Sequence, residues 1–151
     1  MRRSEERILT THVGSLPRDP ALSDLLIRDE LGESIDRGEL ARLGEQAVRH
    51  VVQRQAECGV DIVNDGEQPR VGFQTYVAQR MKGFGGESRR PRPRDYLDFP
   101  GFATWMAKRL PRRSKVSNAP QAVAEVKYED LGPAEEEIRL FRMALAGLAK
   151  Q

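Results

Sequence analysis

Two short segments place polar and charged residues directly after a β-branched run, a position where α/β proteins commonly bind ligands. In Thr10–Arg18, the turn Val13-Gly14-Ser15 offers backbone N–H groups and a hydroxyl. In Asn64–Arg70, two acids, an amide and an arginine surround a glycine, a combination that can bind an ammonium group or accept a proton. The structural alternatives are a plain turn for the first segment and a capped helix start for the second.

Hydrophobic patterning predicts the elements that position both segments. Residues 8–13 and 60–65 are typical of strands, and helices are expected over 21–30 and from 35 to about 57. Gly59 suits the position that follows the second helix. A strand, a crossover helix and a second strand predict a βαβ unit with a parallel sheet. Because adjacent parallel strands lie about 5 Å apart, the loops at their carboxyl ends can share a small ligand.

The second half of the chain predicts more helices and some short extended pieces. Three further helices are expected, over residues 73–84, 99–110 and 133–148. Between these helices, residues 83–98 predict a loop, and two extended pieces, 115–118 and 122–128, predict a hairpin. The last helix carries an apolar stripe of four residues: Ile138, Phe141, Leu145 and Leu148. Together with open sheet edges, this stripe predicts association with a second chain or a second copy.

The composition indicates one soluble domain over residues 1–151. Hydrophobic residues make up 38% and charged residues 32% of the sequence, and no apolar run approaches the roughly 20 residues of a membrane span. The charged N-terminus does not predict a secretory signal, so a cytoplasmic location is expected. One cysteine excludes an intrachain disulfide. A complete (β/α)₈ barrel usually needs about 250 residues, which is more than this chain has.

Charge is distributed unevenly along the sequence. Residues 19–67 hold twelve acids and five bases, whereas residues 80–115 hold eleven bases and three acids. A basic run can bind a polyanion, although a solvated loop interrupted by prolines explains it as well. The run lacks interleaved aromatic side chains for base stacking, so a nucleic-acid or polyanion binder is ranked last and no nucleic-acid partner is expected.

Taken together, the two segments resemble the cobalamin-independent methionine synthase family. The similarity rests on Thr11–Arg18, on residues 59–77 and on Gly83–Glu87, and it extends from residue 8 to about 148. The family fold is a (β/α)₈ barrel, and the matching residues stand at the start of the catalytic barrel. The resemblance therefore implies an α/β chain with a partial TIM-barrel-like fold, made of the first βα units plus a β-hairpin and helix excursion.

The resemblance also implies a reaction and a set of site residues. The family transfers a methyl group from 5-methyltetrahydrofolate to homocysteine, whose sulfur is bound by zinc as a thiolate. The turn Val13-Gly14-Ser15 would contact the amino-acid part of homocysteine, and Glu67 would bind its ammonium group. Lys115 lies near a family contact to folate.

The chain departs from the family at the zinc site. The family ligands are one histidine, two cysteines and an acid on later barrel strands, but here no histidine follows His50 and no cysteine follows Cys58. Both residues lie on or at the end of the predicted crossover helix. His12 is as well explained by a structural hydrogen bond as by a place in the pocket. The chain is therefore expected to hold the amino-acid-binding half of the site, with the zinc ligands on other strands.

Two further interpretations stay open beside the polyanion binder. The leading one is a subunit or fragment of a methyltransferase that is inactive alone and needs a second chain, or a second copy, to complete the barrel. The other is a non-catalytic amino-acid-binding or regulatory module, or the product of a truncated gene. A neighbouring reading frame that carries the missing histidine and cysteines would favour the first.

Overall fold

The computed structural model describes residues 3–86, 91–109 and 120–148 and shows a mixed α/β chain. Its elements in chain order are α1 Pro20–Glu30, α2 Arg37–Glu57, α3 Phe73–Arg80, β1 Met81–Gly85, α4 Arg94–Asp98, α5 Pro100–Arg109, β2 Gln121–Tyr128 and α7 Gly132–Leu148. None of the helices in these described ranges is both long enough and apolar enough to cross a bilayer.

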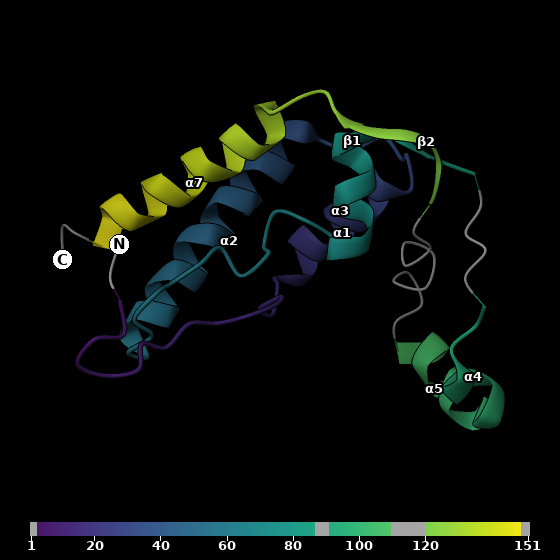
Figure 1. Cartoon of the computed structure of the whole chain (residues 1–151), viewed down its shortest axis with the longest axis horizontal. Coiled ribbons are helices and arrows are strands. Elements are labelled where there is room, and N and C mark those ends of the chain that lie inside the picture. The colour runs from purple at the N-terminus through teal and green to yellow at the C-terminus, as the bar shows by residue number, and fades with distance from the viewer. Residues whose placement is uncertain (1–2, 87–90, 110–119, 149–151) are drawn as a thin grey trace.

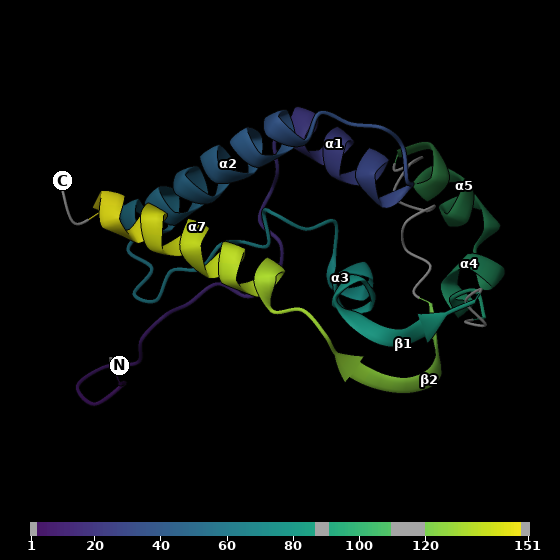
Figure 2. The same cartoon turned by 90° about the horizontal axis from the view of Figure 1, so that it is seen from above.

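The two longest helices, α2 and α7, pack side by side and enclose the core (Figures 1 and 2). Val48 and Val52 of α2 form a buried cluster with Ala144 of α7, and three partly buried residues pack against it: Val63, Phe141 and Leu148. Only half of the apolar stripe predicted on α7 therefore packs against this core, because Ile138 and Leu145 remain 50% and 38% exposed.

Both ends of α2 follow the predicted pattern. At its start, the carboxylate of Asp36 accepts hydrogen bonds from the backbone N–H groups of Gly38 and Glu39, at 2.8 and 3.0 Å. At its end, Gly59 has a φ of 80°, its N–H donates to the carbonyl of Ala56, and the N–H of Val60 donates to the carbonyl of Gln55. This pair of bonds is a Schellman motif, which ends the helix and turns the chain back toward the N-terminal segment.

The two predicted parallel strands are not formed as strands. Residues 8–13 and 60–65 meet in one isolated parallel bridge between Thr11 and Ile62, with the N–H of Ile62 donating to the carbonyl of Thr10 at 3.0 Å. The direction and the neighbourhood were predicted correctly, but a longer ladder was wrong. The reason is that side chains take the remaining backbone groups: the carboxylate of Asp61, for example, accepts from the N–H of Thr10 at 2.9 Å.

The regular sheet lies elsewhere and is antiparallel. β1 pairs with β2 from Met81 opposite Tyr128 to Gly85 opposite Gln121, with a bulge between Lys82 and Phe84. The helix predicted as far as residue 84 therefore ends at residue 80. Of the predicted hairpin, residues 115–118 lie outside the described residues, and β2 pairs with β1.

Gly83 explains why this segment becomes a bulged strand rather than a helix. Its φ is 95°, and a Cβ atom there would stand 2.5 Å from the carbonyl oxygen of Glu125 on β2. Only glycine combines this left-handed backbone with so close an approach of a second strand.

Helices α4 and α5 form an arm beyond the sheet (Figures 1 and 2). They pack against each other through Tyr96 of α4 and Phe102 of α5, whose ring centroids are 5.6 Å apart, and Phe102 also stacks on Trp105 of the same helix at 6.2 Å. Phe102 and Trp105 are also 43% and 51% exposed, so this packing buries only part of the aromatic surface.

Candidate functional site

The two segments predicted to share a ligand are joined by backbone and side-chain hydrogen bonds. The N–H of Leu16 donates to the carbonyl of Gly66 at 2.9 Å. The buried amide of Gln68 donates to the carbonyl of Leu16 at 3.0 Å, and only 1% of Gln68 is exposed. Gly66 has a φ of 58°, and a Cβ atom there would stand 2.8 Å from the side chain of Leu16. The close fit between the segments therefore depends on glycine at this position.

Ser15 and Glu67, predicted as binding residues, are brought together by this junction. The Ser15 hydroxyl donates a hydrogen bond to Oε2 of Glu67. Ser15 is exposed and Glu67 is half-buried, so the pair is open to a ligand from solvent. The hydroxyl and the carboxylate offer groups of the types that bind an amino acid.

Glu67 is held in a backbone conformation that only glycine adopts freely. Its φ is 56°, which costs a side-chain-bearing residue about 1–2 kcal/mol. The backbone N–H of Glu67 donates to Oδ1 of Asp65 at 3.0 Å, and its carbonyl accepts from Nη2 of Arg18 at 2.9 Å. Bonds on both sides of the residue therefore fix the direction in which its carboxylate leaves the chain.

The predicted turn at Val13 and Gly14 lies on the exposed side of the junction. Val13 is 87% exposed, and Gly14 has a φ of 92°. The Nε2 atom of His12 lies 2.9 Å from the carbonyl oxygen of Gly14. The imidazole therefore makes a structural hydrogen bond across this turn, which was one of the two roles considered for it.

Asn64 connects the two segments more directly than the sequence suggested. Its Nδ2 donates to the carbonyl of His12 at 2.6 Å, and its Oδ1 accepts from the N–H of Gly66 at 2.9 Å. The backbone N–H and carbonyl of Asn64 are both bonded by the side-chain amide of Gln55 on α2, at 3.1 and 2.7 Å. The role of Gln55 was missed, although a glutamine that follows Val48, Val51 and Val52 on the apolar face of α2 was a signal for it.

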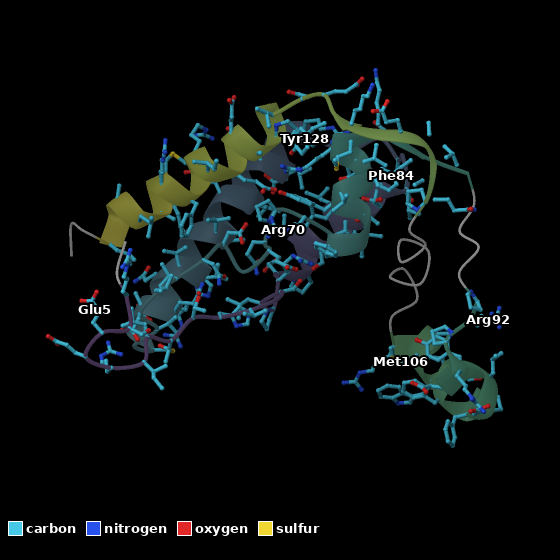
Figure 3. The ribbon with its side chains drawn as sticks, viewed as in Figure 1. Glu5, Arg70, Phe84, Arg92, Met106 and Tyr128 are labelled. Carbon is cyan, nitrogen blue, oxygen red and sulfur yellow. The ribbon has the colours of Figure 1, made fainter. Side chains whose placement is uncertain are left out.

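A second group of charged residues lies between the Glu67 loop and α7, and the sequence analysis did not predict it. Nη1 of Arg70 lies 3.3 Å from Oδ2 of Asp65 and 3.3 Å from Oε2 of Glu137 on α7. Arg80 binds the same Glu137 carboxylate at 2.7 Å, and the Tyr76 hydroxyl donates to it at 2.8 Å. Figure 3 shows Arg70 in the middle of the molecule, between α7 and α3. Residues far apart in sequence form this group, so local patterns could not reveal it.

The ring of Tyr76 lies between the two guanidinium groups. The Cζ atoms of Arg70 and Arg80 stand 4.8 and 3.9 Å from the ring centroid, distances typical of cation–π contacts. Burial raises the pKa of Tyr76 above its ordinary value, and the hydrogen bond to the Glu137 carboxylate raises it further. The hydroxyl therefore stays protonated and acts as a hydrogen-bond donor at neutral pH.

The zinc ion implied by the family resemblance does not fit the described part of the chain. Within residues 3–86, 91–109 and 120–148, no three His, Cys, Asp or Glu side chains come close enough to hold a metal ion. His50 and Cys58 are both exposed, one on α2 and one directly after it. Lys115, the predicted folate contact, lies outside the described residues.

Fold and site together define a class of protein. Two joined loops at the carboxyl ends of parallel extended segments, with a hydroxyl and a carboxylate open to solvent, are typical of α/β proteins that bind small molecules. The family profile described as the catalytic domain of cobalamin-independent synthase matches residues 8–90, which is more than half of the chain. The chain therefore belongs to the cobalamin-independent methionine synthase family.

Two relatives show how much of the family this chain represents. It is 33% identical over 76 residues to the 5-methyltetrahydropteroyltriglutamate–homocysteine methyltransferase of Shewanella oneidensis, which covers 50% of this chain and 10% of the relative. The solved B12-independent methionine synthase from Shewanella sp. W3-18-1, in complex with selenomethionine, has a similar fold at 23% identity and a TM-score of 0.56. That match covers 89% of this chain and 34% of the solved one. The chain thus spans a small part of each relative.

Proposed function

We propose that this chain supplies the part of a methyltransferase site that binds the amino-acid end of homocysteine. The observation that carries the proposal is the Ser15–Glu67 pair at the junction of the two segments. The chain belongs to a family whose relative is named for homocysteine and a methyltetrahydrofolate. In this proposal, 5-methyltetrahydrofolate is the methyl donor and Lys115 is a contact for it.

The proposed chemistry of this chain is binding and orientation. The Glu67 carboxylate would bind the ammonium group of the substrate, since a charged hydrogen bond is stronger than a neutral one. When substrate binds, the Ser15 hydroxyl would turn its single O–H from Glu67 to the substrate carboxylate, beside the backbone N–H groups of the turn at Val13 and Gly14. Zinc, held by ligands outside this chain, would stabilise the substrate sulfur as a thiolate.

The fold supports a proposal about partners as well. Residues 1–151 would form the N-terminal part of a (β/α)₈ barrel that other strands complete. The single parallel bridge leaves Ile8 85% and Ile62 46% exposed, and such apolar residues beside unpaired backbone favour pairing with further strands. We propose that these strands belong to a second chain or to a second copy, and sedimentation with and without the neighbouring gene product tests this. A monomer that neither self-associates nor binds that product would contradict it.

The binding proposal is tested by Glu67→Gln, which keeps the shape of the side chain and removes its charge. Loss of one charged hydrogen bond should weaken L-homocysteine binding by about 1.5–3 kcal/mol, or roughly tenfold or more in Kd. Isothermal titration calorimetry measures this on the full chain, or on the complex once the partner is supplied. Glu57→Gln on exposed α2 surface is the matched control. Unchanged affinity in Glu67→Gln would contradict the assignment.

A non-catalytic amino-acid-binding module is the second candidate. It would use the same Ser15–Glu67 pair and would need no metal ligands. The two candidates differ in one result, because only the methyltransferase subunit should gain methyl-transfer activity when the missing strands and zinc are supplied.

A further inference from the structure

A chain of hydrogen bonds connects α7 to the backbone of Glu67. It begins at Oε2 of Glu137, which lies 3.3 Å from Nη1 of Arg70. The same guanidinium reaches both carboxylate oxygens of Asp65, at 3.3 and 3.4 Å. Oδ1 of Asp65 then accepts the backbone N–H of Glu67 at 3.0 Å. Three contacts therefore link residue 137 to the residue proposed to bind the substrate ammonium group.

The side chains in this series of hydrogen bonds are largely shielded from solvent. The side chains of Arg70 and Asp65 are each 20% exposed, and that of Glu137 is 18% exposed. Ion pairs in such surroundings are screened less than pairs on the surface. By contrast, the neighbouring Glu136 pairs with Arg139 on the same helix, and both side chains are 53% exposed.

The last link acts on a backbone that needs support. Glu67 has a φ of 56°, and its neighbours must hold a non-glycine residue in that conformation. Asp65 supplies this support on the N–H side, and Arg70 determines where the Asp65 carboxylate lies. If Arg70 lost its bond to Glu137, only the contact with the Tyr76 ring would still hold the guanidinium beside Asp65, and the Glu67 backbone would relax.

From this arrangement we infer that Glu137 of α7 is a positioning residue for Glu67 and acts through Arg70 and Asp65. This inference deepens the proposed function and rests on it for the ligand. Glu137 does not touch the proposed substrate site itself. It makes the direction of the Glu67 carboxylate depend on α7 being docked against the loop, 70 residues further along the chain.

If Glu137 only held α7 in place, replacing either of its arginine partners would have the same effect on Glu67. Glu137 also binds Arg80 at 2.7 Å, and Arg80 has no bond to Asp65 among the described contacts. Replacing Arg80 weakens the attachment of α7 but leaves the Arg70–Asp65 link in place. The two single variants Arg70→Met and Arg80→Met therefore separate positioning from docking.

The experiment compares Glu137→Gln with the control Glu136→Gln in the full chain. The first readout is hydrogen exchange of the Glu67 amide, followed by ¹⁵N NMR, which reports local opening without any ligand. We expect exchange to be about tenfold faster in Glu137→Gln and in Arg70→Met, equal to about 1.4 kcal/mol of lost protection. It should be unchanged in Glu136→Gln and Arg80→Met, and partly restored in Arg70→Lys.

The second readout is the Kd for L-homocysteine, measured by calorimetry. Glu137→Gln should weaken binding about fivefold or more while adding nothing to the loss already caused by Glu67→Gln, since both act on one carboxylate. Equal amide exchange in Glu137→Gln and Glu136→Gln would overturn the positioning role. So would a loss in Arg80→Met that matches Arg70→Met. If the wild type bound no homocysteine but amide exchange changed as expected, the proposed function would fail and the positioning role would stand.

Discussion

Gln55→Met tests whether α2 holds the loop that carries Glu67. Gln55 is 6% exposed, and its side chain bonds the backbone carbonyl and N–H of Asn64 at 2.7 and 3.1 Å. Methionine keeps the length of the side chain and is a good helix former. The change therefore removes these two bonds and a third to the carbonyl of Val51, which lies in the same helix. Each half-buried backbone group left without its partner costs about 1–2 kcal/mol, which gives a total of about 2–4 kcal/mol.

Urea unfolding followed by circular dichroism measures this loss. With an m-value of about 2 kcal/mol per molar urea, the midpoint should fall by about 1–2 M. Gln53→Met is the control, because the exposed Gln53 amide donates to Glu57 on the same helix at 2.9 Å and should cost less than about 0.5 kcal/mol. If both variants lowered the midpoint equally, the bonds to Asn64 would contribute nothing and the reasoning would be refuted.

Three other changes give measurable outcomes. Hydrogen bonds hold the pKa of Asp61 below its ordinary value, so the stability it contributes is lost as pH falls below about 4; the thermal midpoint of Asp61→Asn should approach that of the wild type between about pH 6 and pH 2. Burial and a neighbouring carboxylate raise the pKa of Tyr76, so its contribution to the free energy of unfolding is full below about pH 10 and is lost as pH rises through the raised value. In Tyr76→Phe, the free energy of unfolding should therefore depend less on pH over that alkaline range. Gly83→Ala should cost about 3 kcal/mol or more in urea unfolding, against about 1 kcal/mol for Gly86→Ala, where nothing lies within 4 Å; equal losses would contradict the bulge argument.

Most helices could be predicted well because their signals are local, although the loop predicted over residues 83–98 was wrong where α4 forms at Arg94–Asp98. Asp36 caps α2 through its own side chain, and Gly59 ends the helix by adopting a positive φ. The last helix begins at Gly132, next to the proline and acids that predicted it. These features need only the neighbouring residues, so the sequence is sufficient to place them.

The sheet was predicted less well because strand pairing depends on distant partners. The apolar spacing of residues 73–84 suits a helix, but the close approach of β2 at Gly83 converts its end into β1. Conversely, residues 8–13 and 60–65 have strand-like composition, yet they form only one bridge. A β-branched run becomes a strand only where neighbours complete its hydrogen bonds, and the local sequence does not contain that information.

The candidate site was predicted in part for the same reason. The proximity of Ser15 and Glu67 was predicted because each follows a β-branched run and the resemblance paired them, and the structure brings them into contact. Glu137 and Gln55 were not found, because they support the site from behind and belong to helices whose patterns indicate only packing. Supporting residues of this kind become visible only when the tertiary contacts are known.

Asn64 shows what replaces a sheet ladder at this site. All four of its hydrogen-bonding groups are used: the backbone N–H and carbonyl by Gln55, the Nδ2 by the carbonyl of His12, and the Oδ1 by the N–H of Gly66. An aspartate could not donate to His12, and a glutamine would be too long to bond Gly66 two residues away. In a continuous sheet, neighbouring strands would satisfy the same backbone groups without regard to side-chain type. Because side chains do so here, the order of the junction beneath Ser15 and Glu67 depends on the identities of a few polar residues rather than on strand pairing.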